Sequence, residues 1–295
     1  METIGSVSIE TSPSDMNYQP PKALQTQRKN RAIKPAIQNK FEFDSNIPFE
    51  CKHGIKITGI GVTRADHLLL CNNSSTDVMV LSHDGKQLNN ISLEGRPWGI
   101  VVVPDKQEAI VTLPMYKFIQ IINTTTMRAD QKIMVPVGCI GITLIDNDIV
   151  LGNSGVIYII NRESQCLNTI KVGKGMMFSL YCGKDKTLYC CDRDNNTLYG
   201  MKQDGTIMFS FSSGDIRGPI GVAAAGNGNL YVTAWRSNNV HCFTPDGKHK
   251  GIMLKKGDGL NQPYVIAVSK KSSKIFIVNF RGKKCAKVFP LLITF

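Results

Sequence analysis

The sequence repeats the same pattern of turns about every forty residues. Tight turns built on Asp-Gly or similar residues separate short apolar segments along most of the chain. They occur at His83-Asp84-Gly85-Lys86, Asn123-Thr124-Thr125, Asn161-Arg162-Glu163, Gln203-Asp204-Gly205 and Pro245-Asp246-Gly247-Lys248. This spacing leaves room for about four short strands in each repeat and shows no helical periodicity.

A second series of mostly small residues keeps the same period. Its members are Gly59, Gly99, Gly141, Ser179, Gly221 and Val265, each within a similar apolar segment. Two series in register indicate six repeats. One four-stranded sheet cannot bury both of its faces alone, whereas a ring of such sheets packs each against its neighbours. The repeats therefore predict an all-β, six-bladed β-propeller of four-stranded blades.

In each predicted blade the first strand lines the central channel, where small residues suit the crowding of converging strands. The last repeat, from Tyr264 to Phe289, has room for three strands. We expect the segment Lys40–Asp44 to supply the fourth strand and so close the ring. The third repeat is short, which predicts irregular geometry between Cys139 and Val172.

Residues 1–38 differ in kind from the predicted propeller at 39–295. They combine prolines with polar residues and lack periodic apolar positions, which predicts a disordered segment. Their basic run Gln27–Arg31 is consistent with a solvated linker, with a basic arm or with a localisation signal.

Composition narrows the class of protein. No apolar run approaches the length of a membrane span, and the start of the sequence does not resemble a signal peptide. Nine cysteines in that context suggest reduced thiols and a cytoplasmic protein. The excess of 35 Lys and Arg over 23 Asp and Glu permits a nucleic acid or an acidic protein as partner.

With the repeats aligned, two stretches share one pattern: an Asp or Asn turn, an apolar strand and an Asp-Gly turn. They are Asp192–Gly205 and Trp235–Gly247, and Asn72–Gly85 follows the pattern loosely. With Gly95–Ile100 and Thr112–Pro114, they resemble the NHL-repeat propellers of tripartite-motif (TRIM-NHL) proteins, notably the group expanded in molluscs. The resemblance covers roughly residues 40 to 290.

In that family the propeller recognises RNA or protein, while RING, B-box and coiled-coil regions supply ubiquitin-ligase activity and assembly. This sequence has no matching Cys/His clusters or heptads before the propeller. The resemblance thus implies a substrate-recognition or scaffold domain, without ligase activity in this chain. Without a coiled coil we expect a monomer.

Strand order assigns the binding face. In such blades the loops that lead into the first strands and the turns between second and third strands lie on one face, here called the top face. Cations exceed acids there, and aromatic residues are interleaved with them, as in sites for single-stranded RNA and in protein hot spots. Alternatively, the cations are ordinary solvated loop residues, and Trp98 packs between blades. The predicted partner-binding residues are Arg96, Trp98, Tyr116, Lys117, Lys174, Arg193, Arg217, Arg236, Lys256, Tyr264 and Arg281.

An enzyme is the alternative class. Six-bladed propellers of the gluconolactonase type hold a divalent cation over the channel with carboxylate and amide oxygens. The six predicted inner strands contain no Asp, Glu or His. No G-x-S-x-G elbow or Walker-type loop occurs. The sequence thus predicts no catalytic residues, no metal site and no cofactor, with a metal-dependent lactonase or hydrolase as the alternative.

Overall fold

Short antiparallel strands form almost all the regular structure of the protein. The computed structural model describes residues 55–280 and the strand Ala286–Pro290. The chain divides into two units, residues 1–39 and 40–295, and every described residue belongs to the second. The predictions for residues 1–38 and for a closing strand at Lys40–Asp44 fall outside the described residues. No helix in the described part is long and apolar enough to span a membrane.

The described strands form five hydrogen-bonded sheets. The first holds β1 (Ile57–Val62), β2 (Leu68–Asn72), β3 (Asp77–Leu81) and β4 (Gln87–Ser92). The second holds β5 (Ile100–Val102), β6 (Glu108–Leu113), β7 (Phe118–Asn123) and β8 (Arg128–Met134), with the 3-10 turn η1 (Pro114–Tyr116) between β6 and β7. The third has six strands, β9 (Gly141–Ile145), β10 (Asp148–Ile160), β11 (Cys166–Cys182), β12 (Leu188–Asp192), β13 (Thr197–Met201) and β14 (Ile207–Phe211).

The remaining two sheets complete the described propeller. One holds β15 (Pro219–Ala224), β16 (Leu230–Ala234), β17 (Asn239–Phe243) and β18 (His249–Leu254). The other follows the 3-10 turn η2 (Lys256–Asp258) and holds β19 (Pro263–Ser269), β20 (Lys274–Asn279) and β21 (Ala286–Pro290).

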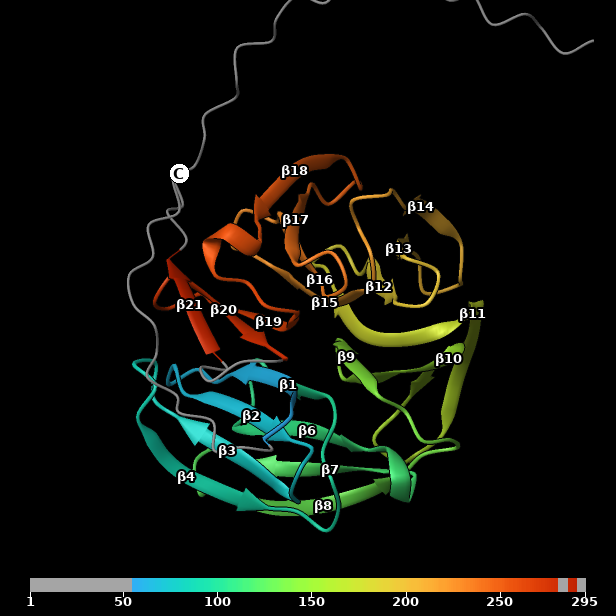
Figure 1. The fold of residues 1–295 in the computed structure, drawn as a ribbon. Helices are drawn as coiled ribbons and strands as arrows, with labels where there is room; N and C mark the ends of the chain where they lie inside the picture. Colours follow the sequence, from blue (N-terminus) through green and yellow to red (C-terminus); the bar gives the residue numbers. More distant parts are fainter. Residues whose placement is uncertain (1–54, 281–285, 291–295) are drawn as a thin grey trace, which may run out of the picture. The chain divides into compact units, whose positions relative to one another are not determined.

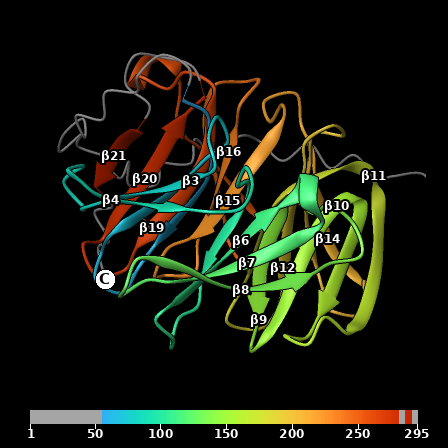
Figure 2. The same ribbon diagram turned by 90° about the horizontal axis from the view of Figure 1, so that it is seen from below.

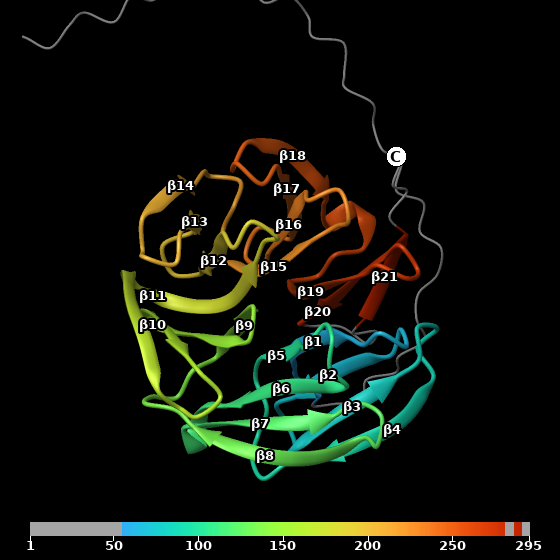
Figure 3. The same ribbon diagram turned by 180° about the vertical axis from the view of Figure 1, so that it is seen from behind.

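The sheets surround a central channel as in a β-propeller (Figure 1). Strands β1, β5, β9, β11, β15 and β19 lie innermost and contact one another in that order, and β19 contacts β1 to close the ring. Figure 3 shows β5 between β1 and β9, and Figure 2 gives the view turned by 90°. The inner strands enclose a cavity of about 260 Å³.

Apolar side chains fill the spaces between neighbouring sheets. The second strands β2, β12 and β16 are buried along their whole length, whereas the outer strand β4 is largely exposed. Six clusters of buried residues lie in the described part of the chain. Five join neighbouring sheets, and the sixth lies within the six-stranded sheet. Each sheet is thus stabilised by burial against both neighbours.

The predicted propeller of antiparallel sheets is confirmed, but only three of the five described sheets have four strands. The irregularity falls at the short third repeat. Strand β11 pairs with β10 through residues 166–171 and again at Met176, and with β12 through Met177–Cys182, within one uninterrupted strand. Hydrogen bonding therefore continues from one repeat into the next.

The glycines of the second repeat series lie where neighbouring inner strands come closest. A Cβ on Gly59 would lie 2.5 Å from the carbonyl oxygen of Trp98, and one on Gly221 would lie 2.8 Å from that of Tyr264. A Cβ on Gly99 would overlap the carbonyl oxygen of Ile140 in the same way. The period of small residues thus has a steric cause: the backbone of the next repeat occupies the space of a side chain.

Substitution of Gly59 by Ala should destabilise the propeller by about 1–3 kcal/mol, because the added methyl group meets a backbone oxygen that cannot rotate away. Thermal and urea unfolding would measure the loss. Gly226→Ala is the matched control, since no atom lies within 4 Å of a Cβ there. Equal stability of the two variants would contradict the steric explanation.

Candidate partner-binding face

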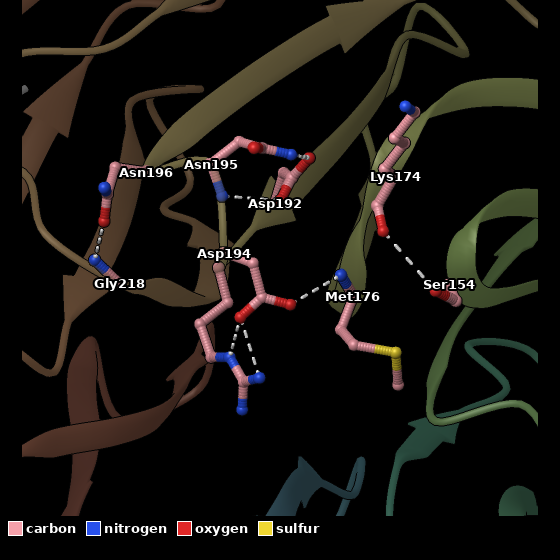
Figure 4. A network of polar contacts seen from close by, with 9 residues as sticks. Ser154, Lys174, Met176, Asp192, Asp194, Asn195, Asn196 and Gly218 are labelled. Atoms are coloured by element: carbon pink, nitrogen blue, oxygen red, sulfur yellow. Dashed lines mark hydrogen bonds and ion pairs between the residues drawn. The ribbon is translucent and has the colours of Figure 1, made fainter.

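Hydrogen bonds join the loops before the inner strands to the turns between second and third strands. Asn73 Nδ2 donates to the carbonyl oxygen of Pro97 at 3.1 Å, and the Arg236 N–H donates to that of Arg217 at 3.1 Å. The Gly218 N–H donates to Asn196 Oδ1 at 2.7 Å (Figure 4). These two kinds of loop therefore form one face, the top face, as the strand order requires.

Three aromatic rings from different sheets meet at the top of the channel. Trp98 precedes β5, Phe178 lies in β11 and Tyr264 lies in β19. Phe178 has its ring centroid 6.1 Å from that of Trp98 and 6.4 Å from that of Tyr264. Phe178 and Tyr264 also line the channel cavity. We call these three rings the aromatic lid.

Two further rings extend the lid beyond Tyr264, namely Phe280 after β20 and Trp235 after β16. Tyr264 stacks on Phe280 at 4.9 Å, and Phe280 contacts Trp235 edge-on at 6.2 Å. Tyr264 is buried, and this burial raises its pKa to about 12 although the nearby Arg193 lowers it. Tyr264 is therefore a packed neutral phenol.

Arg193 covers the lid from outside. Its guanidinium lies 4.3 Å from the centroid of Phe178, and its Nη2 is 2.8 Å from Asp194 Oδ1. The Met176 N–H donates to the other Asp194 oxygen at 3.2 Å (Figure 4). Burial raises the pKa of Asp194, but the Arg193 hydrogen bond, the Met176 N–H and the charge of Arg236 outweigh it and hold the pKa below its ordinary value. Arg193 and Asp194 thus form a compact ion pair over the lid.

The turn that presents this pair is held from below by Asp192. This carboxylate is fully buried and accepts hydrogen bonds from the backbone and side-chain nitrogens of Asn195, at 3.0 and 2.8 Å (Figure 4). Both bonds fix the backbone of the turn, as Asp commonly does.

The backbones of Arg217 and Arg236 lie side by side on the neighbouring sheet. Both side chains are exposed, and the Arg236 guanidinium lies 5.7 Å from the Trp235 ring centroid. The Arg217 N–H donates to Ser237 Oγ at 3.1 Å, which fixes the loop before β15 to the turn after β16. Neither arginine forms an ion pair with a residue in the described ranges.

The other predicted site residues are spread around the top face. Arg96, Lys117, Lys174 and Lys256 are exposed, and none forms an ion pair within the described part of the chain. Tyr116, at the end of η1, is 53% exposed and its ring lies over Gly95. The carbonyl of Lys174 accepts a bond from Ser154 Oγ at 3.5 Å (Figure 4). Arg281 lies outside the described residues.

The structure therefore brings Trp98, Arg193, Tyr264 and, more laterally, Arg236 toward the mouth of the channel. It adds Phe178, Phe280 and Asp194, which the sequence analysis did not select. Phe178 occupies the first strand of its repeat, beside Ser179 of the small-residue series. This is the one signal in the sequence that could have placed its ring near the axis.

The described residues at the mouth present few ligands for a metal ion. The residues that line the channel cavity include no Asp, Glu or His. Within the described ranges no group of three or more His, Cys, Asp or Glu residues could hold a metal. Asp192 and Asp194 are instead engaged by Asn195, Arg193 and Met176.

A buried histidine supports the loop that carries Arg217. His241, on β17, has its Nδ1 3.0 Å from Nε2 of His249, and its Nε2 lies 3.2 Å from the carbonyl oxygen of Asp215. Burial lowers the pKa of His241 to about 4, and the positive charge of protonated His249 adds to that effect. Burial likewise lowers the pKa of His249. The His241 side chain is fully buried.

These lowered pKa values predict a loss of stability in mild acid. An unfolded chain takes up a proton on His241 near pH 6.5, whereas the folded chain does so only near pH 4. Stability should therefore be complete above pH 6.5 and fall as the pH drops toward 4, by on the order of 2 kcal/mol. Urea unfolding between pH 7.5 and 4.5 would measure the slope. His241→Gln should flatten it, whereas the exposed control His83→Gln should leave it unchanged.

Comparison with known proteins supports the fold. No family model and no curated protein sequence matches the chain. Virginiamycin B lyase from Staphylococcus aureus is 17% identical, with a TM-score of 0.60 over 81% of this chain and 85% of that one. A streptogramin B lyase is 15% identical, with a TM-score of 0.63 over 84% and 86% of the two chains. The β-propeller domain of Cps50 (Swd1) from Myceliophteria thermophila is 13% identical, with a TM-score of 0.61 over 80% and 82%. At these sequence identities the similarity is one of fold, the β-propeller.

Proposed function

We propose that this chain is a non-catalytic recognition module, a six-bladed NHL-type propeller that binds a protein or single-stranded RNA through its top face. One observation carries the proposal. Exposed arginines and lysines without ion-pair partners in the described ranges surround an aromatic lid at the channel mouth. A macromolecule with negative charge complements that surface.

Six blades follow if the six-stranded sheet is divided within β11. Its residues 166–171 and Met176 pair with β10 and complete the third blade, and Met177–Cys182 begin the fourth. The ring of six inner strands and the six apolar clusters of the described part support this division. The last sheet has three described strands, which leaves a place for a strand from outside the described ranges.

The lid supports a binding role over catalysis. Where propeller hydrolases hold a metal over the channel, this chain places the rings of Trp98, Phe178 and Tyr264. A virginiamycin B lyase from Staphylococcus aureus loses catalysis when one histidine is replaced by alanine. Here the histidines of the described ranges, namely His67, His83, His241 and His249, do not line the channel cavity.

Replacing Arg96, Arg217 and Arg236 together by Glu should weaken partner binding at least roughly tenfold, because charge is reversed at the centre of the surface. Two measurements on cell extract would test this: crosslinking to total RNA, and affinity capture after nuclease treatment. Arg64→Glu, Arg128→Glu and Lys248→Glu together make the same charge change away from the mouth and should bind normally. Equal binding by both triple variants would contradict a top-face site.

Addition of calcium or zinc should leave the melting temperature of the metal-free protein unchanged, since no cluster of ligands exists in the described part. A ligand present at 100 times its Kd would stabilise the fold by about 2.7 kcal/mol, which thermal unfolding detects readily. A reproducible rise at millimolar metal would favour the hydrolase alternative instead.

A further inference from the structure

Several aromatic rings around the mouth have a partner on one face. Arg193 covers Phe178 at 4.3 Å, and Arg236 lies 5.7 Å from the Trp235 centroid. Tyr264 stacks on Phe280 with 28° between the rings. Recognition of single-stranded RNA requires open ring faces on which successive bases stack. The rings at this mouth are packed, so they serve as an apolar floor and provide few stacking platforms.

The mouth of the channel already binds one carboxylate of the chain itself. Asp194 is bound there by the Arg193 guanidinium, through Nε and Nη2, and by the backbone N–H of Met176. This arrangement of one planar cation and additional donors is the typical protein site for a carboxylate. Asp194 forms its ion pair with Arg193, and the charge of Arg236 acts on it without an ion pair.

The neighbouring arginines are Arg217 and Arg236. Backbone hydrogen bonds hold together the two loops that carry them. The Arg236 N–H donates to the Arg217 carbonyl, and the Trp235 N–H donates to that of Gly218, both at 3.1 Å. Ser237 Oγ, which accepts from the Arg217 N–H, donates in turn to Asn239 Oδ1 at 2.8 Å. This support reduces the ordering cost of binding at the pair.

The acidic residue closest in sequence does not neutralise this pair. Asp215 forms no ion pair with the residues that the structure describes. Its carbonyl accepts bonds from His241 and Asn239, and its charge acts on the histidine pair, where it raises both pKa values against the larger effect of burial. The two guanidinium groups are thus available to an anion from outside.

From these contacts we infer that Arg217 and Arg236 together bind a carboxylate of an acidic polypeptide segment, with the apolar flank of that segment on Trp235 and Phe280. The inference rests on the proposed recognition function and selects its partner class. Arginine and tryptophan at the centre of a surface are typical of protein hot spots. The unpaired positive charge of the top face supplies the complementarity to Asp and Glu.

Two parallel selections on the full chain test this inference. A display library of random 12-residue peptides and a pool of random single-stranded RNA would each be enriched against the immobilised protein. We expect peptides rich in Asp and Glu beside an apolar residue, and little enrichment of RNA. The Arg217→Glu, Arg236→Glu variant should lose the selected peptides, and Arg64→Glu, Arg128→Glu, with the same change in charge, should retain them.

A conservative variant separates the carboxylate site from general attraction. Arg217→Lys, Arg236→Lys keeps both charges but loses the planar donors, so affinity for the selected peptides should fall about tenfold. Unchanged affinity would overturn the paired-arginine site. Enrichment of RNA instead of acidic peptides would overturn the inference while leaving the recognition function intact. Enrichment of neither would contradict both.

Discussion

The rest of the propeller depends on the close approach of neighbouring inner strands through glycine. At Gly99 and Gly221 the oxygen that a side chain would strike belongs to the next inner strand or the residue before it. A threonine completes the contact. Thr233 Oγ1 accepts from the Gly221 N–H and donates to the carbonyl of Tyr264, both at 2.9 Å, and Thr112 makes the same bonds for Gly99. This pairing of a glycine with a threonine sets the distance between neighbouring inner strands and hence the width of the channel.

A channel held this narrow brings side chains from different blades into contact above it. Trp98, Phe178 and Tyr264 meet because each follows or adjoins one of these close approaches. Their rings meet at the top of the channel, and Arg193 and Asp194 cover them. The mouth of the channel therefore presents packed aromatic rings in its centre and guanidinium groups around them.

Individual residues show how far the sequence can predict this arrangement. The glycine period predicted the inner strands because the close approach of backbones allows only small residues at those positions. Trp98 and Tyr264 were selected because each lies in or beside a loop of the top face. Phe178 was not selected, because it lies within a predicted inner strand, although it adjoins Ser179 of the same series. The merging of the third and fourth repeats was also missed, since a turn and a continuous strand at residues 173–175 can have the same composition.

Taken alone, the sequence determined the repeat, its antiparallel strands, the ring of sheets and the shared face of its loops. These follow from periodic turns, small residues and short apolar segments, all of which act over short distances along the chain. Only the tertiary structure decided which cations remain unpaired and which ring faces are covered. Arg193 and Arg217 look alike as sequence positions, yet one is paired with Asp194 and the other is free of ion pairs within the described ranges. That difference depends on contacts between separate turns and strands, which the sequence pattern does not record.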